Sequence, residues 1–528
     1  MKAAADLIKS MDETVDPCSD FYNFACGNFI KERVLPDHKD FISSIDPIID
    51  KKNLRLRKLF EEKAVGCEPQ AYQNVRNYFQ ACMDTKSIEE KGVGQLKALL
   101  DDIGGWPVLL GEKWQGENFQ WHQLSVKASD KGFSSDRMIT IRISTDYKDS
   151  AKRMLWVYGP KLGLRREYLI KGADNENVKD YLQYMVDSAV FLGANREAAL
   201  TEMKDALDLE QKIAELTLPR EEMRNMTALY NTMTIKEASA LYPKLPWVEY
   251  INAVLSLDRM VSVDENEVVN VAVPKYIEEF GKLIATVPAR TIANLIMWRN
   301  VQSSMSYLSE EAIQIQNGMG SKSPRWQKCL TATAKDSRKT LQTAVGAMYV
   351  KKYFRTAAKE FTEDMVTNIR KEFKDMINKL EWMDEKTKQS SVERIDLMRT
   401  EIGYPKEILD DRLLDDSIDG LVLSKASYLK NDLHLNIWKS KNNAKEFRQP
   451  VDKKSWKNWR SAVRVSAGYS ATKNSIAFSA GILDGMFFQK DRPLYMNYGA
   501  IGSVVGHEIT HGVTGDLVLE KARSVISS

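Results

Sequence analysis

The chain has 528 residues, of which 43% are hydrophobic and 28% are charged, and its formal net charge is +3 at pH 7. This length predicts roughly two to four domains, or one large body with two lobes, and it provides ample apolar material for a core. The small net charge argues against nucleic acid or an anionic membrane as a partner, and no run of about 18 apolar residues could cross a membrane.

The cysteine content bears on the compartment in which the protein folds. The five cysteines are Cys18, Cys26, Cys67, Cys82 and Cys329. An odd number leaves at least one thiol unpaired in an oxidising compartment, whereas a cytosolic protein would keep five reduced, mostly buried thiols. Asn225-Met226-Thr227 would accept an N-linked glycan only in a secreted chain. The first nine residues are too polar for a signal peptide, so we expect no export signal in this sequence.

The first 385 residues are predicted to be mostly helical. The segment 16–29 has two cysteines and four aromatic residues, which indicates a packed helix that is either stapled by the cysteines or simply amphipathic. Further along we expect helices at 54–63, 72–83 and 179–214, a break at 104–107, and a half-buried strand at 139–144, where apolar and polar residues alternate.

The next part of the chain is predicted to lead from helices into a catalytic segment. A helix is expected at 365–382, and Asp384 should cap the following helix, which ends near Gly403. Residues 406–460 are polar and are interpreted as a connecting region. Residues 475–480 alternate like a strand, which could offer its edge to an extended peptide.

A metal-binding pattern lies near the C-terminus, where Gly506–Gly512 contains the sequence H-E-x-x-H. If the segment is helical, His507 and His511 project from one face, since they lie four residues apart. Two nitrogen ligands at this spacing suit Zn²⁺, and Glu508 is placed to act as a general base. The apolar spacing of the flanking residues supports a helix with one buried face. The alternative is a chance match on a surface helix with two solvated histidines.

Together, the motifs make the chain resemble the neprilysin-like zinc metallopeptidases, the family that includes the endothelin-converting enzymes. The motifs that carry the resemblance are Asp16-Pro17-Cys18 through Cys26-Gly27, Tyr78 through Asp84, Arg325 through Cys329, Glu381 through Asp384, Ile402 through Pro405, Ala480 through Leu483 and Gly506 through Gly512. The resemblance implies a mainly α, two-lobed helical ectodomain around an internal cavity, with a small and incomplete thermolysin-like α/β catalytic segment at the C-terminus. The expected divisions are a pre-domain segment at 1–15, a helical peptidase region at 16–410, a connecting region at 411–464 and a catalytic region at 465–528.

The resemblance also implies an activity. The chain would be a zinc metalloendopeptidase at the cell surface or outside the cell, with small peptides as substrates and one Zn²⁺ per complete enzyme. His507 and His511 would bind the metal, and Glu508 would take a proton from water and pass it to the leaving amine. A third hypothesis is a cytosolic helical scaffold in which H-E-x-x-H occurs by chance. The presence of all the other family motifs in the same chain disfavours it.

The chain departs from the family pattern at the strand that binds substrate. The family strand usually reads Asn-Ala-Tyr or Asn-Ala-Phe, and the matching place here is Ser466-Ala467-Gly468-Tyr469. We expect Ser466 and Ala467 to contact the substrate, but the serine hydroxyl has a shorter reach than an asparagine amide. The substitution therefore puts substrate affinity in question and leaves the metal ligands unaffected.

A second departure concerns the third zinc ligand. In the family this ligand is a Glu on a later helix, within a Glu-x-x-x-Asp pattern that is absent from the 17 residues after His511. Asp516 and Glu520 are the only carboxylates there. The start of the chain also falls near the family's ectodomain boundary, after its usual membrane anchor. We therefore expect a product truncated at both ends, with weak zinc binding and a partly exposed apolar face on the H-E-x-x-H helix. The alternative function is a non-catalytic ectodomain fragment that binds a peptide or a partner.

The resemblance implies one disulfide within the chain, between Cys82 and Cys329. Cys18 and Cys26 match positions whose family partners have no counterpart in this sequence, so they are expected to be free or mispaired. Cys67 has no assigned partner.

Overall fold

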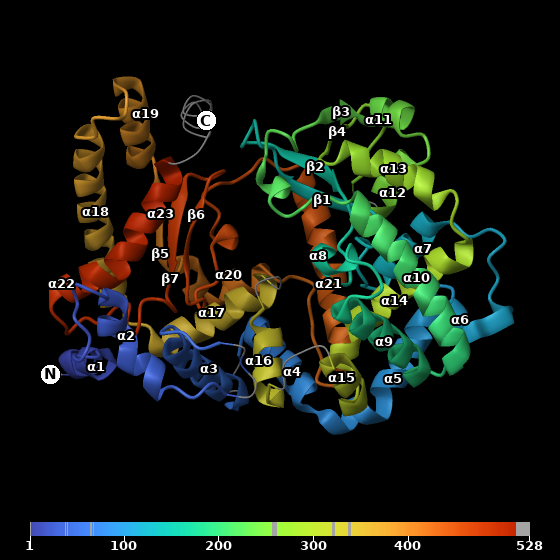
Figure 1. Ribbon diagram of the computed structural model, residues 1–528, viewed down its shortest axis with the longest axis horizontal. Helices are drawn as coiled ribbons and strands as arrows, with labels where there is room; N and C mark the ends of the chain where they lie inside the picture. The colour runs from blue at the N-terminus through green and yellow to red at the C-terminus, as the bar shows by residue number, and fades with distance from the viewer. Residues whose placement is uncertain are drawn as a thin grey trace. The chain divides into compact units, whose positions relative to one another are not determined.

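The computed structural model describes residues 2–513 apart from 37, 38, 40, 64, 65, 67, 256–260, 319–322 and 336–338. The chain divides into two compact units built from interleaved segments. The first unit comprises Met1–Val65, Ser321–Leu414 and Trp456–Ile526, and the second comprises Gly66–Gly320 and Asp415–Ser455. The predicted mainly α-helical class is confirmed (Figure 1). The predicted four-part division of the chain stays a prediction.

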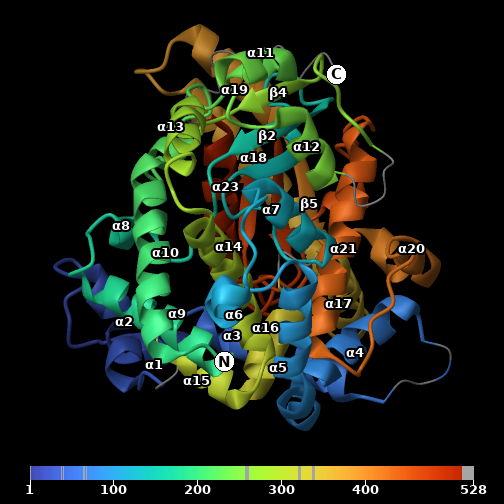
Figure 2. The same ribbon diagram turned by 90° about the vertical axis from the view of Figure 1, so that its right-hand side faces the viewer.

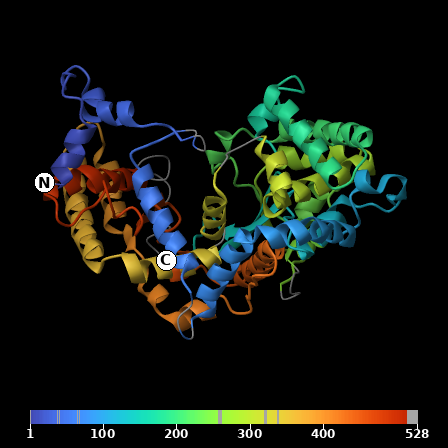
Figure 3. The same ribbon diagram turned by 90° about the horizontal axis from the view of Figure 1, so that it is seen from below.

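The first unit contains helices from three distant parts of the sequence and a small sheet. Its helices are α1 (Lys2–Ser10), α2 (Phe21–Glu32), α3 (Asp46–Glu61), α16 (Arg325–Thr333), α17 (Lys339–Tyr353), α18 (Thr356–Asn378), α19 (Glu385–Asp396), α22 (Leu494–Asn497) and α23 (Ser503–Val513). Its strands are β5 (Arg399–Gly403), β6 (Ala467–Ser470) and β7 (Ser475–Ser479). Helix α3, drawn in blue in Figure 3, packs against α16 and α17.

The sheet of the first unit has the order β5-β7-β6. Strand β7 pairs in parallel with β5 and antiparallel with β6, so both of its edges are occupied and all five of its residues are buried. The strand predicted at 475–480 is confirmed as β7. The expectation that it could offer its edge to a peptide is wrong, because both edges are paired. The edge strand next to it in sequence is β6.

The second unit is larger and mostly helical. Its helices are α4 (Gln70–Met83), α5 (Thr85–Asp102), α6 (Pro107–Leu110), α7 (Trp121–Asp130), α8 (Arg166–Leu169), α9 (Glu176–Phe191), α10 (Arg196–Leu216), α11 (Ile235–Leu241), α12 (Trp247–Leu255), α13 (Pro274–Ile284), α14 (Ala289–Ser304), α15 (Glu310–Asn317) and α21 (Tyr428–Phe447). The strands β1 (Thr140–Thr145), β2 (Arg153–Tyr158), β3 (Thr232–Thr234) and β4 (Val268–Val271) form a sheet of order β1-β2-β4-β3. Helix α10 packs against both α9 and α14 (Figure 2), and Trp106, Trp156 and Trp298 lie in the core. The short helix α20 (Asp411–Asp416) lies where the chain passes from one unit to the other.

Several predicted elements are found close to their expected bounds. Helix α4 covers the segment predicted at 72–83, and β1 lies within one residue of the predicted strand. The break near Pro107 falls between α5 and α6. Asp384 caps α19, because its carboxylate accepts a hydrogen bond from the Thr387 backbone N–H. These features depend on residues close together in sequence, which is why the pattern alone predicted them.

Other predictions are wrong. The segment 179–214 is two helices, because Gly193 has φ of +104°, which favours glycine, and Asn195 caps the second helix. Residues 399–403 form strand β5, where a helix was expected to continue. The polar region 406–460 contains the 20-residue helix α21, whose buried face includes Leu429, Leu433 and Phe447. Cys18 and Cys26 are both free, so the alternative of a helix stapled by these cysteines is excluded, and the expectation from the resemblance that they would not form their family pairs is confirmed.

Candidate metal centre and active site

The H-E-x-x-H segment lies on helix α23, which packs against α18, α19 and β6 (Figure 1). Ile501, Val505 and Ile509 have no solvent exposure and belong to the apolar core of the first unit. The predicted helix with one buried face is therefore confirmed. The expectation that this face would be partly exposed is wrong, because helices α18 and α19 come from a distant part of the chain and cover it.

The entry into α23 is held by the side chain of Asn497, which is fully buried. Its amide nitrogen donates to the Gln489 carbonyl at 3.0 Å, and its amide oxygen accepts hydrogen bonds from the Gln489 backbone N–H and Arg492 Nε. A π-helical turn at Tyr498–Gly502 then leads into α23. Turns of this kind, which widen the helix locally, occur often beside functional residues.

The two histidines of α23 converge on the solvent side of the helix. The Nε2 atoms of His507 and His511 are 3.0 Å apart, and the ring planes are perpendicular. Two imidazole nitrogens bound to one tetrahedral zinc ion lie roughly 3.3 Å apart, given Zn–N bonds of about 2.0–2.1 Å. The donor pair therefore fits a divalent metal, and its exposed face leaves room for further ligands.

Glu508 lies between the histidines in sequence but projects from a more enclosed part of the helix, and only 6% of it is exposed. Across the described residues, no cluster of three or more His, Cys, Asp or Glu side chains could hold a metal ion. This part of the chain therefore supplies two metal donors and one nearby carboxylate. The predicted alternatives for a third ligand, Asp516 and Glu520, lie outside the described residues.

Strand β6 forms one of the two edges of the sheet and packs against α23. The Tyr469 ring lies close to Gly512, and a methyl group added at Gly512 would come within 2.3 Å of Met398. The glycine after the second histidine therefore leaves room for the end of the Met398 side chain, while the contact with Tyr469 is an ordinary van der Waals contact. Arg394 donates a hydrogen bond of 2.9 Å to the Tyr469 hydroxyl, which helps to fix the strand.

The two predicted substrate-binding residues lie at the start of this edge strand. The Ser466 carbonyl accepts a hydrogen bond from the Ser479 backbone N–H, so it is used within the sheet. The Ser466 hydroxyl is shielded from solvent and has no hydrogen-bond partner among the described residues. The Ala467 carbonyl accepts a hydrogen bond of 3.1 Å from Arg460 Nη1. At this edge, the Ser466 hydroxyl thus lacks a hydrogen-bond partner among the described residues, and the Ala467 carbonyl is bound by the Arg460 guanidinium.

Arg460 is a residue that sequence reasoning missed. Its guanidinium covers Gly468, where an added Cβ would approach Arg460 within 2.2 Å. On β5, the other outer strand of the sheet, burial raises the pKa of Glu401, while the charges of Lys473, Arg399 and Arg460 oppose that rise. Arg460 precedes the strand by several residues and carries no recognisable motif, so only the folded sheet reveals its contact with Ala467.

The remaining predicted residues lie in separate places. Cys82 and Cys329 form the disulfide that the resemblance implied. Cys67 lies outside the described residues. Asn225 is exposed in the second unit, where its side-chain oxygen accepts a hydrogen bond from the Ala228 backbone N–H. Its use as a glycan acceptor stays a prediction.

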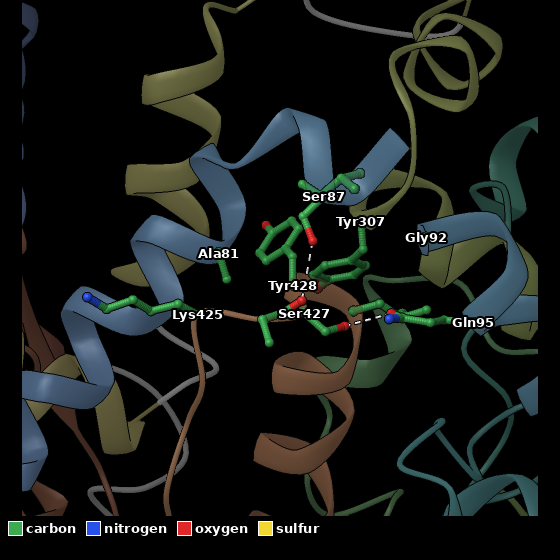
Figure 4. A pocket seen from close by; sticks show the side chains of 11 residues that line it. Ala81, Ser87, Gly92, Gln95, Tyr307, Lys425, Ser427 and Tyr428 are labelled. Carbon is green, nitrogen blue, oxygen red and sulfur yellow. Dashed lines mark hydrogen bonds between the residues drawn. The ribbon is translucent and has the colours of Figure 1, made fainter. Parts of the chain in front are cut away.

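A small cavity lies in the second unit between α4, α5 and the start of α21 (Figure 4). Its volume is about 10 Å³, which is about the room of one water molecule. The Ser427 hydroxyl donates to Gln95 Oε1 at 2.7 Å, and Ser87 lies at 3.5 Å from the Ala426 carbonyl. The polar lining groups therefore largely satisfy one another and leave no activated nucleophile.

Comparisons with known proteins agree with this geometry. The sequence models of peptidase family M13 match residues 17–405 and 466–521. Neprilysin-2 of Drosophila melanogaster is 36% identical over 524 residues, covering 96% of this chain and 67% of that protein. Human membrane metallo-endopeptidase-like 1 is 32% identical, covering 97% and 67%, and human endothelin-converting enzyme 1 is 30% identical, covering 97% and 66%. The chain thus spans about two thirds of the length of these relatives.

Solved structures share the fold at lower sequence identity. The zinc metalloprotease ZMP1 of Mycobacterium tuberculosis, in complex with an inhibitor, matches with a TM-score of 0.80 at 21% identity, covering 95% of this chain and 74% of that one. PepO from Lactobacillus rhamnosis matches with a TM-score of 0.80 at 19% identity, covering 97% and 78%.

The family models and the sequence relatives show that the chain belongs to peptidase family M13, and its lineage is that of a metalloendopeptidase. None of the described helices combines the length and apolar character that a membrane crossing requires.

The Cys82–Cys329 disulfide leads to a testable expectation. Cys82→Ser should lower the free energy of unfolding by about 2–5 kcal/mol, because the bond closes a long loop and restricts the unfolded chain. Chemical denaturation of protein made through a secretory route measures the loss. Cys18→Ser is the matched control and should leave the midpoint unchanged, because Cys18 is free and exposed. An equal midpoint for Cys82→Ser and the wild type would contradict the assigned role.

Proposed function

We propose that this protein is a zinc metalloendopeptidase that hydrolyses small extracellular peptides. The observation that carries the proposal is the convergence of the His507 and His511 Nε2 atoms, 3.0 Å apart, beside Glu508 on a helix that packs on an edge strand. Metal-assisted peptide hydrolysis requires side chains that bind the metal, a carboxylate that accepts a proton and a surface that holds the peptide. The two imidazoles, Glu508 and the free edge of the strand can supply these three parts. The family matches support the same reaction class.

In this proposal His507 and His511 hold Zn²⁺, which polarises the scissile carbonyl and activates water when it is bound. Glu508 accepts the proton from the attacking water and delivers it to the departing amine. The low exposure of Glu508 supports this role, since a carboxylate with restricted access to bulk water keeps its proton transfers local.

The peptide backbone would lie along the outer edge of β6. Edge strands bind extended peptides through their unpaired backbone groups. The orphaned Ser466 hydroxyl would then gain a substrate partner, as buried polar groups generally require. The Ala467 carbonyl would exchange the Arg460 guanidinium for a substrate N–H, so Arg460 would turn away from the edge as the peptide binds.

The proposed location is extracellular or at the cell surface. A disulfide between Cys82 and Cys329 supports an oxidising compartment, because such bonds are rare in the cytosol. The exposed sequon at Asn225 is compatible with secretion. Peptides are the proposed partners. A net charge of +3 on 528 residues gives no support to nucleic acid as a ligand.

The experiment that tests the metal centre replaces His511 by Ala. The variant should lose bound zinc after dialysis and lose cleavage of a quenched-fluorescence peptide, because one imidazole on α23 cannot hold the metal. His434→Ala is the matched control, since His434 is exposed on α21 in the second unit. Wild-type zinc content and turnover in His511→Ala would overturn the proposal. A wild-type protein that binds no zinc and cleaves nothing would favour the non-catalytic alternative.

A further inference from the structure

A second cavity of about 610 Å³ lies wholly within the second unit. One wall is formed by β1 and β2 and another by the residues after the C-terminal end of α10. The segment 159–166, which leads from β2 into α8, lines it as well. Helix α8 packs beside α10 (Figure 2). This volume is in the range of cavities that bind drug-sized ligands or short peptide segments.

The lining of this cavity is cationic. Arg142, Lys161, Arg165 and Arg166 line it, and no Asp or Glu does so among the described residues. The Arg166 guanidinium donates to the Thr217 carbonyl at 2.9 Å. Arg142, Lys161 and Arg165 are exposed and form no ion pair within the part of the chain that the structure describes. Three cations without a carboxylate around one cavity favour an anionic ligand.

The same cavity also presents apolar groups. Leu162, Leu218, Met223 and Met226 contribute to its lining, and Met223 is 36% exposed. Methionine is flexible and polarizable, so it adapts to side chains of different shape. A purely polyanionic ligand would leave these surfaces without a partner, whereas a ligand with both carboxylates and apolar side chains would satisfy both parts.

The segment 159–166 is held in place by a buried charge network beneath it. The Gly163 N–H donates to Glu210 Oε1 at 2.7 Å, and Arg299 Nη1 donates to the Lys161 carbonyl at 2.7 Å. Glu210 and Arg299 are themselves paired at 2.9 Å with 2% and 6% of their side chains exposed. Gln302 adds a hydrogen bond to the Gly163 carbonyl.

This anchoring fixes the backbone that carries Lys161 and Arg165 before any ligand binds. The segment gives both backbone donors and acceptors to fixed partners, and a methyl group at Gly163 would collide with the Tyr181 hydroxyl at 1.9 Å. A segment that is already ordered loses little entropy when a ligand arrives, so more of the interaction energy remains as affinity.

We propose that this cavity binds a peptide segment in which acidic side chains alternate with apolar ones. Arg142, Lys161 and Arg165 would pair with the carboxylates, while Met223 and Met226 would contact the apolar side chains. The inference goes beyond the proposed hydrolysis, because the cavity contains neither the metal ligands nor Glu508. Binding here and cleavage at α23 can therefore fail separately.

The test measures binding by fluorescence anisotropy in Glu508→Gln protein. The probe is a labelled eight-residue peptide with Glu alternating with Leu and Phe, and its control has Gln in place of Glu. The acidic peptide should bind at least about tenfold more tightly than the Gln peptide. The double variant Arg142→Gln/Arg165→Gln should weaken acidic-peptide binding by about tenfold, since it removes two of the three cations that pair with the carboxylates. Met223→Ser should weaken both peptides.

The matched control is Arg196→Gln/Lys204→Gln, which removes the same charge from exposed positions of α10 outside the lining. It should leave the affinity within twofold of the parent, and a thermal unfolding curve should show that each variant folds. Equal affinity for the two peptides, or no effect of the two arginine changes in a folded protein, would overturn the proposal. Tighter binding of inorganic polyphosphate than of the acidic peptide would overturn it as well.

Discussion

In a form of the protein that holds zinc, Glu508→Gln is expected to keep the zinc content at the wild-type level and to slow peptide hydrolysis by about 10²–10⁴-fold, the usual contribution of a general base. The amide matches the carboxylate in size, so the packing of α23 should not change. It cannot take a proton at neutral pH, and the imidazoles of His507 and His511 remain in place to hold the metal. Metal analysis after dialysis, together with kcat for a quenched-fluorescence peptide, checks both halves of the expectation.

The control for this variant is Glu385→Gln, which makes the same chemical change at an exposed position of α19. It should leave kcat and zinc content unchanged. A Glu508→Gln protein with near-normal turnover would show that another group acts as the base. Loss of zinc together with activity would show instead that Glu508 helps to hold the metal.

Arg299→Met is expected to lower the free energy of unfolding of the second unit by about 3–5 kcal/mol, because it leaves the Glu210 carboxylate buried without its cation. Only 2% of the Glu210 side chain is exposed. Tyr181 and Gly163 also donate hydrogen bonds to this carboxylate, but neutral donors offset a buried charge only in part. Thermal and urea unfolding, followed by tryptophan fluorescence, measures the loss.

The double variant Glu210→Gln/Arg299→Met separates charge from packing. Removing both charges should recover a large part of the stability, since replacing a whole buried pair costs less than breaking it. Lys282→Met is the surface control, because its ion pairs with Glu278 and Glu279 are exposed and such pairs are worth little. A double variant as unstable as Arg299→Met alone would mean that the guanidinium acts through packing and its hydrogen bond to Lys161.

The features that the sequence determined by itself are local. The placement of His507 and His511 on one face follows from helical geometry over five residues, and the burial of Ile501, Val505 and Ile509 follows from their spacing. The cap at Asp384 and the break at Pro107 depend on the residues beside them. The assignment to the neprilysin-like family also came from short motifs.

The features that only the tertiary structure decided depend on contacts between distant residues. Strand β7 is central because β5, more than 70 residues earlier, pairs along one of its edges. The outer strands are therefore β5 and β6, and the proposed peptide site is moved from β7 to β6. Helix α21 could not be recognised in the sequence, because its composition is polar and only a narrow face reaches the core of the second unit. The contact of Arg460 with the Ala467 carbonyl and the burial of Glu210 against Arg299 are likewise set by packing. Periodicity reports which face of an element is apolar, but the partner that covers this face is selected only when the chain folds.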